Sequence, residues 1–227
     1  MLKKIFQYQL SHLLLALLFL MATAWVITQD TDLLRGGVFE QPTGVWFWLA
    51  IATPVLHQVY VAIIWRLELY KQTFTSIWGL KKAFLLYAVG FAVLFVGRLI
   101  VIIILAYSNA NTLSVEPYLA YILAAVMTPL VLYLFYSVKK YFTVERAFGI
   151  DHFDKSYDVP YVKGGIFKYT NNGMYIVGLL ILFIPGLLLL SKAALVAGLF
   201  NYLYIWVHYF CVEKPDMMEI YGQTPKG

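Results

Sequence analysis

The sequence predicts an all-α polytopic membrane protein, a bundle of about six transmembrane helices with both termini on the cytoplasmic side. Three observations lead to this fold class. Apolar residues make up 62% of the 227 positions and charged residues only 13%, whereas an ordinary globular domain is about 45–50% apolar. Several apolar stretches approach or exceed the roughly 20 residues that cross a bilayer. Lysine and arginine are also divided unevenly between alternate connecting segments.

Six stretches are long and apolar enough to cross the hydrocarbon core. Each is predicted to be a helix, because backbone groups in lipid must hydrogen-bond within their own segment. The stretches are Leu10–Thr28, Gly44–Trp65, Ala83–Tyr107, Pro117–Val138, Asn172–Leu190 and Lys192–Val212. The first has features of a secretory signal, but we expect it to be a true span. Only Ser191 separates the last two, which predicts a tight helical hairpin, and Pro185-Gly186 predicts a kink in its first helix.

The positions of lysine and arginine predict the orientation, because cytoplasmic segments of membrane proteins are enriched in these residues. Fourteen of them lie at the N-terminus, between spans two and three, between spans four and five, or in the C-terminal tail. Only Arg35 and Lys192 lie in the alternate segments, and Arg98 lies inside a span. The net charge of +5 therefore follows from topology and needs no nucleic-acid partner.

The chain divides into an N-terminal four-span region, 1–138, and a C-terminal region, 139–227, that carries the unusual sequence features. The second region opens with the longest polar segment, 139–171, on the predicted cytoplasmic side. Connections longer than about 12–15 residues are usually functional or disordered. This one is rich in aromatic residues and poor in Ser and Gln, so we expect it to fold over the membrane surface.

A polar stripe is predicted along the last span. Its residues recur at helical spacing and end just before Glu213; they are Asn201, Tyr204, His208 and Cys211. Polar side chains in a membrane helix usually face the bundle or a wet cavity. We expect the stripe to face a second set at the start of span five, Asn172, Tyr175 and Gly178. The alternative is that the stripe only makes interhelical hydrogen bonds.

Other polar residues have simpler interpretations. Arg98 lies within a membrane span, where a charged residue is often functional, but snorkelling toward the membrane surface explains it as well. His57 and Gln58 are explained by a polar contact within the bundle. The segment Trp65–Tyr70 is interpreted as an interfacial belt of aromatic and charged residues. The single cysteine, Cys211, has no companion for a disulfide or a metal site. No nucleotide-binding, zinc or catalytic-triad motif is present.

Two motifs stand in the C-terminal third, Phe167–Gly178 and Glu213–Gly222. Together they resemble the phospholipid N-methyltransferases and, more distantly, the isoprenylcysteine carboxyl methyltransferases. The first motif has Asn171, Asn172, Tyr175 and Gly178 at the family's positions, and the second is similar to the family's acidic pair followed by Pro, Glu, Ile and Tyr. The sequence departs from the pattern at Gly173, where Pro is common, and at Lys214, which replaces the second acidic residue.

The resemblance implies S-adenosylmethionine as cofactor, bound at the cytoplasmic end of the last two spans, and a lipid substrate that enters from the bilayer. The residues expected to bind the cofactor are Tyr169, Asn171, Asn172, Met174, Tyr175, Gly178, His208 and Glu213. An ethanolamine ammonium must lose a proton before it accepts a methyl group, and His152 and Glu219 are the candidate catalytic bases, with Asp151 nearby. No metal is expected.

The favoured acceptor is the amine of phosphatidylethanolamine, in a bacterial inner membrane or the endoplasmic reticulum. Two alternatives stay open. One is carboxyl or thiol methylation of a prenylcysteine or another lipophilic substrate. The other is a non-enzymatic transporter or assembly factor that keeps the hairpin but has lost the chemistry through Lys214.

Overall fold

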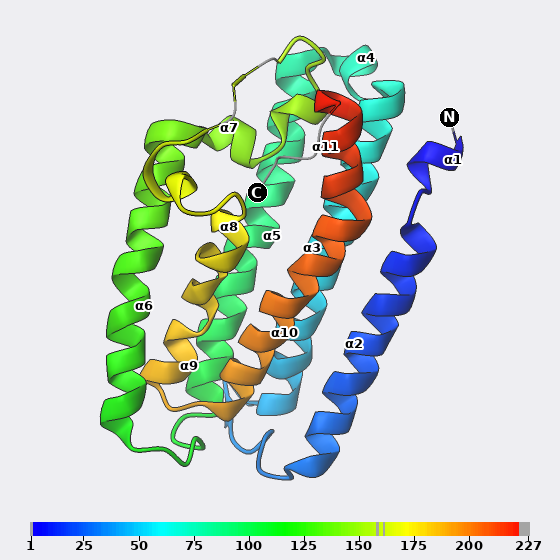
Figure 1. The fold of residues 1–227 in the computed structure, drawn as a ribbon. Coiled ribbons are helices and arrows are strands. Elements are labelled where there is room, and N and C mark those ends of the chain that lie inside the picture. Colours follow the sequence, from blue (N-terminus) through cyan, green and yellow to red (C-terminus); the bar gives the residue numbers. More distant parts are fainter. Residues whose placement is uncertain (1, 158, 161, 223–227) are drawn as a thin grey trace.

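The structure is a computed structural model that describes residues 2–157, 159–160 and 162–222. Within these residues, five helical segments are long and apolar enough to cross a membrane: Leu2–Gln29, Thr43–Lys71, Leu80–Ser108, Pro117–Phe142 and Lys192–Tyr221. They run side by side in one bundle (Figure 1). The predicted all-α polytopic class is therefore confirmed. Helices α1 (Leu2–Ile5) and α11 (Lys214–Tyr221) lie at the same end, which we call the α11 end.

The first three predicted spans form long helices: α2 (Gln9–Gln29), α3 (Thr43–Lys71) and α5 (Leu80–Ser108). Helix α2 buries only His12, Ala16 and Thr23 and leaves most of its leucines exposed. Such a surface is stable only in contact with lipid, because an apolar patch of this size is costly in water. Helix α3 instead buries residues along its whole length against α5 and α10 (Lys192–His208).

At the end opposite to α11, a small antiparallel hairpin joins α2 to α3. Strands β1 (Gly37–Val38) and β2 (Gln41–Pro42) pair Gly37 with Pro42. Gly36 precedes the hairpin with φ at 106°, and a Cβ there would lie 2.1 Å from the Ser108 carbonyl oxygen. Only glycine permits this approach between the hairpin and the end of α5.

At the α11 end, a buried carboxylate organises the turn from α3 to α5. Glu68 is fully buried and accepts hydrogen bonds from the backbone of Phe74 and Thr75 at the start of the short helix α4 (Thr75–Trp78). Its other contact is the Thr75 hydroxyl. The interpretation of this region as an interfacial belt is wrong for Trp65, Arg66 and Glu68, since all three are buried.

The polar segment 139–171 packs against the bundle in its described residues. Helix α6 (Pro117–Ser137) continues into the π-helical turn η1 (Val138–Phe142), and short helices α7 (Val144–Ala147), η2 (Ile150–His152) and η3 (Gly165–Lys168) follow. Phe153 is 1% exposed and packs on Tyr87, while Phe148 lies against Phe91. Aromatic side chains thus anchor this segment to the bundle.

The fifth predicted span, Asn172–Leu190, is not one continuous helix. It is broken into α8 (Gly173–Ile176), the 3-10 segment η4 (Gly178–Leu182) and α9 (Ile184–Leu188). Pro185 lacks a backbone N–H and is favoured in the first turn of a helix, so a new helix begins at Ile184, just before the predicted kink. A 3-10 segment rises about 2 Å per residue against about 1.5 Å for an α-helix, which lengthens this short piece.

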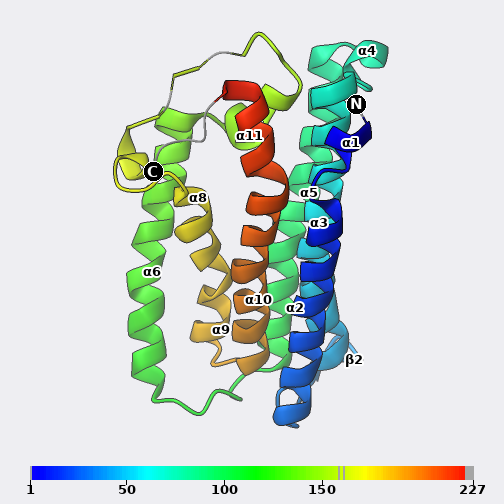
Figure 2. The same ribbon diagram turned by 45° about the vertical axis from the view of Figure 1, so that its right-hand side comes forward.

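Helix α10 stands at the centre of the bundle (Figures 1 and 2). It is capped by Ser191, whose hydroxyl accepts from the Ala194 N–H, and it continues through the π-helical turn η5 (Tyr209–Glu213) into α11. Figure 2 shows α8, α9 and α6 on one side of α10 and α2 and α3 on the other. The predicted hairpin of the last two spans is present, with Leu189–Ser191 as its turn.

Candidate active site

The two sequence motifs meet at the α11 end of the hairpin. Tyr175 on α8 donates its hydroxyl hydrogen to the Glu213 carboxylate at the end of η5. The Tyr175 ring also packs edge-on against Trp206 and Tyr209, each 6.0 Å away between ring centroids. A half-buried carboxylate thus lies beside a group of aromatic rings.

The start of the broken helix is shaped by two close approaches. The Asn172 carbonyl accepts from the N–H groups of Tyr175 and Ile176, so it begins the single turn α8. Gly173 is buried, and a Cβ there would lie 3.2 Å from Ile166. A Cβ at Gly178 would lie 2.8 Å from Leu134 on α6. The second glycine therefore lets this segment press against α6.

Beside the hairpin, a buried ionic network holds η2 against α3 and α11. His152 Nδ1 lies 3.0 Å from Asp151 Oδ1, and its Nε2 lies 3.7 Å from Asp216 Oδ2. The ring stacks on Trp65 with 4.0 Å between centroids. Burial disfavours the charged ring, but the Asp151 and Asp216 carboxylates outweigh it and raise the pKa of His152 to about 9. The Asp151 carboxylate also accepts from the Tyr221 hydroxyl at 2.9 Å.

Arg66 ties three parts of the chain together and is 1% exposed. Its Nε lies 2.7 Å from Asp216 Oδ1. Its Nη1 donates to backbone carbonyls near the N-terminus, those of Lys4, Ile5 and Gln7. Its Nη2 donates to the Cys211 carbonyl at 3.1 Å. A planar guanidinium with five donors is suited to such a junction.

The structure brings together only some of the predicted cofactor-binding residues. Tyr175 and Glu213 are in contact, and Asn171, Asn172 and Gly178 lie on the same segment as Tyr175. Tyr169 is 77% exposed, while Met174 packs on the apolar cluster of Leu134, Ile166 and Phe167. The predicted base Glu219 lies on the surface of α11, paired with Lys4 at 2.6 Å.

The polar stripe on α10 does not face the start of span five, and that prediction is wrong. Asn201 donates to the Ala50 carbonyl on α3, Tyr204 contacts His12 on α2, and the His208 ring lies 5.8 Å from Trp65. The stripe therefore makes the interhelical contacts of the alternative interpretation, on the face of α10 away from Tyr175. Helical spacing identified a shared face but not the helices that cover it.

All four histidines of the chain are buried. His12, His152 and His208 gather around Trp65 and Tyr204, with the rings of His12 and His208 6.2 Å apart. His57 instead accepts from Arg98 at 2.8 Å between Nδ1 and Nη2. Arg98 is 3% exposed, so it does not snorkel outward. Among the described residues, no group of three or more His, Cys, Asp or Glu side chains is placed to hold a metal ion.

Sequence reasoning missed Trp65, Arg66 and Asp216 as members of this end of the molecule. Asp216 follows Lys214 by two residues and is fully buried. One signal could have identified Arg66: Arg66 and Glu68 directly continue the apolar run of span two, and the structure places them in the same helix, Thr43–Lys71. Charges that extend a buried helix need partners, and a carboxylate in the second motif was one candidate.

The fold and this end of the hairpin define a class: a polytopic α-helical membrane protein in which two polar motifs meet beside a broken helix. Residues 115–224 match the family model described as Phospholipid methyltransferase. The match confirms the resemblance and spans α6, the 139–171 segment, the hairpin and α11. It supports a membrane phospholipid methyltransferase in general. Searches of curated proteins and of solved structures gave no significant match.

Proposed function

We propose that the protein transfers a methyl group from S-adenosylmethionine to the amine of a membrane phospholipid, phosphatidylethanolamine. The observation that carries the proposal is the contact between Tyr175 and Glu213, which joins the two family motifs across 38 positions of sequence. The family match over residues 115–224 supplies the reaction class. The cofactor, the acceptor and the roles of individual residues are the parts proposed here.

The residues around Glu213 fit the chemistry of this cofactor. S-adenosylmethionine supplies an electrophilic methyl group on a cationic sulfonium. A half-buried carboxylate attracts cationic or hydroxyl groups, and the rings of Tyr175, Trp206 and Tyr209 offer aromatic faces and edges for a cation or an adenine. With Lys214 in place of the family's second acidic residue, Glu213 carries this role alone.

The chain's own contribution is to position the groups and to accept a proton. In-line approach of a held amine to a held methyl group supplies much of the acceleration of such a transfer. A base must be unprotonated to act, and a pKa of about 9 keeps His152 charged at neutral pH. This favours an anchoring role for His152. The exposed Glu219 carboxylate is then the better supported of the two proposed bases.

The first test is a direct binding titration of S-adenosylmethionine to the purified protein. Replacing the carboxylate in Glu213→Gln should weaken binding at least tenfold, since a charge-assisted contact is worth about 1.5–3 kcal/mol. Tyr175→Phe should weaken it less. Glu145→Gln, an exposed carboxylate on α7 at the same end, is the matched control. Equal affinity of the unmodified protein and all three variants would show that Glu213 does not bind the cofactor.

The second test identifies the acceptor. In reconstituted membranes, methyl label from S-adenosylmethionine should appear on phosphatidylethanolamine, and Glu213→Gln should abolish the transfer. Label found only on a prenylated cysteine analogue would make the acceptor assignment wrong and keep the reaction class. Binding of the cofactor without transfer to any lipophilic amine, thiol or acid would favour a non-enzymatic role.

A further inference from the structure

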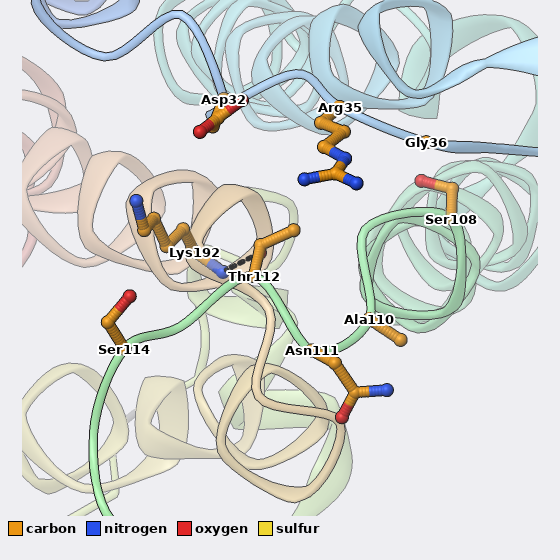
Figure 3. Close-up of a pocket in the computed structure, with 9 residues that line it drawn as sticks. All are labelled: Asp32, Arg35, Gly36, Ser108, Ala110, Asn111, Thr112, Ser114 and Lys192. Carbon is orange, nitrogen blue, oxygen red and sulfur yellow. Dashed lines mark hydrogen bonds between the residues drawn. The ribbon is translucent and has the colours of Figure 1, made fainter.

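A second polar site lies at the opposite end of the bundle, away from both motifs. It is a pocket of about 460 Å³ formed by the α2–β1 loop, the α5–α6 connection and the start of α10 (Figure 3). Lys192 on its wall and Glu213 are separated by almost the whole of α10 and η5, about 30 Å at the rise of an α-helix. The pocket is therefore separate from the proposed active site.

Two opposite charges line this pocket without meeting each other. In the described part of the chain, neither the Arg35 guanidinium nor the Asp32 carboxylate forms an ion pair, although both side chains lie at the pocket (Figure 3). The third charged residue, Lys192, is already engaged by Asp30 at 2.7 Å. The pocket thus offers one free cation and one free anion from its described residues.

The backbone that carries Arg35 is held in place by buried side chains. The Arg35 carbonyl accepts from Asn109 Nδ2 at 2.8 Å and from Thr43 Oγ1 at 3.1 Å. Asn109 is 1% exposed, and its Oδ1 accepts from the Ala193 N–H at the start of α10. One buried amide therefore fixes three walls of the pocket relative to one another, and such pre-organisation lowers the entropic cost of binding a ligand.

We propose that this pocket binds the zwitterionic headgroup of an ethanolamine phospholipid. The phosphate pairs with Arg35, whose planar fork matches phosphate oxygens, and the primary ammonium pairs with Asp32. The pocket lies at the ends of the membrane-spanning helices α5 and α10, the depth at which headgroups of that leaflet lie. The site is a binding site only, and its occupancy does not depend on methyl transfer at the other end.

The test uses the full-length protein in lipid nanodiscs with two photoactivatable lipids, one with an ethanolamine and one with a glycerol headgroup. Crosslinked peptides are identified by mass spectrometry. The ethanolamine probe should label the peptides around Gly36 and Asn111, and both Arg35→Gln and Asp32→Asn should reduce this labelling at least tenfold. The glycerol probe has a phosphate but no ammonium, so only Arg35→Gln should reduce its labelling.

Two matched controls and one competitor complete the experiment. Lys81→Gln at the α11 end and Glu116→Gln at the pocket end but outside the pocket should leave labelling unchanged. Retained labelling of Asp32→Asn by the glycerol probe shows that the pocket is still folded. Equal labelling of every variant, or the same variant pattern with both probes, would overturn the proposal. Competition by soluble glycerophosphoethanolamine as strong as that by short-chain phosphatidylethanolamine would overturn the assignment to a bilayer lipid.

Discussion

At the scale of single residues, the α11 end is organised by charges that the membrane cannot solvate. Arg66 and Asp216 are both almost completely buried and form an ion pair, and the His152 ring shares the Asp216 carboxylate. A buried charge without a partner is strongly destabilising, so these residues depend on one another. They also join segments that are far apart in the sequence: the N-terminus, the end of α3, η2 and α11.

The His152 network predicts a stability that depends on pH. The pKa of His152 is about 9 in the folded protein against about 6.5 in the unfolded chain. Its contribution is therefore complete below about pH 6.5 and is lost as the pH rises through 9. We expect the loss to approach about 3 kcal/mol at most, seen as a lower thermal midpoint at pH 10 than at pH 6.

The matched protein for this measurement is His152→Gln, which keeps a polar group but cannot be charged. Its midpoint should be lower at pH 6 and should fall less between pH 6 and pH 10. The pKa of Asp151 is lowered, because its bonds to His152 and Tyr221 outweigh the effect of burial, so its own contribution is lost only under acidic conditions. A steep fall that is identical in both proteins would assign the effect to other groups.

At the scale of elements, the sequence predicted where the helices lie better than how they face one another. Five of the six predicted spans were placed within a few residues at most ends, because their apolar runs are long. The fifth was predicted as continuous although Gly178 and Pro185 interrupt it, since hydropathy measures apolar length and not backbone hydrogen bonding. In the site, family motifs located Tyr175 and Glu213, whereas the pairing of Arg66 with Asp216 is a tertiary contact. The sequence shows that both charges need partners but not that they meet each other.

The broken helix yields a packing prediction at Gly178. Gly178→Ala places a methyl group 2.8 Å from a Leu134 methyl carbon, and overpacking of this kind costs about 1–3 kcal/mol. The substitution should lower the thermal midpoint, and Leu134→Val in the same protein should recover part of the loss. Gly97→Ala on α5 is the control, because a Cβ there meets nothing within 4 Å. It should be neutral or stabilising, whereas equal losses in both variants would point to backbone flexibility.

At the scale of the whole molecule, the uneven distribution of charge agrees with the arrangement of the helices. The segments with many lysines and arginines, marked by α1, α4, α7 and α11, gather at one end, and Arg35 and Lys192 lie at the other (Figure 1). The bundle thus has one basic end and one end at which the acidic residues outnumber Arg35 and Lys192. Anionic lipids on one leaflet would favour a single orientation of this molecule.

This asymmetry predicts that the α11 end is cytoplasmic. A reporter fused after the C-terminus, or inserted in the 139–171 segment, should read as cytoplasmic, because short basic segments are retained on that side. A reporter inserted at Glu40 in the β1–β2 turn should read as exported. An exported C-terminal reporter together with a cytoplasmic signal from Glu40 would invert the model of the topology and place the proposed active site on the opposite face.

The burial of every histidine has a consequence for the reactivity of the protein. The four imidazoles are 1–4% exposed and the single thiol, Cys211, is 5% exposed. Reagents that acylate imidazole or alkylate thiols act on groups that they can reach, so these five side chains should be nearly inert to both classes in the native protein. Modification would then proceed only as fast as the bundle opens. The five side chains together form a built-in reporter of unfolding that needs no added label.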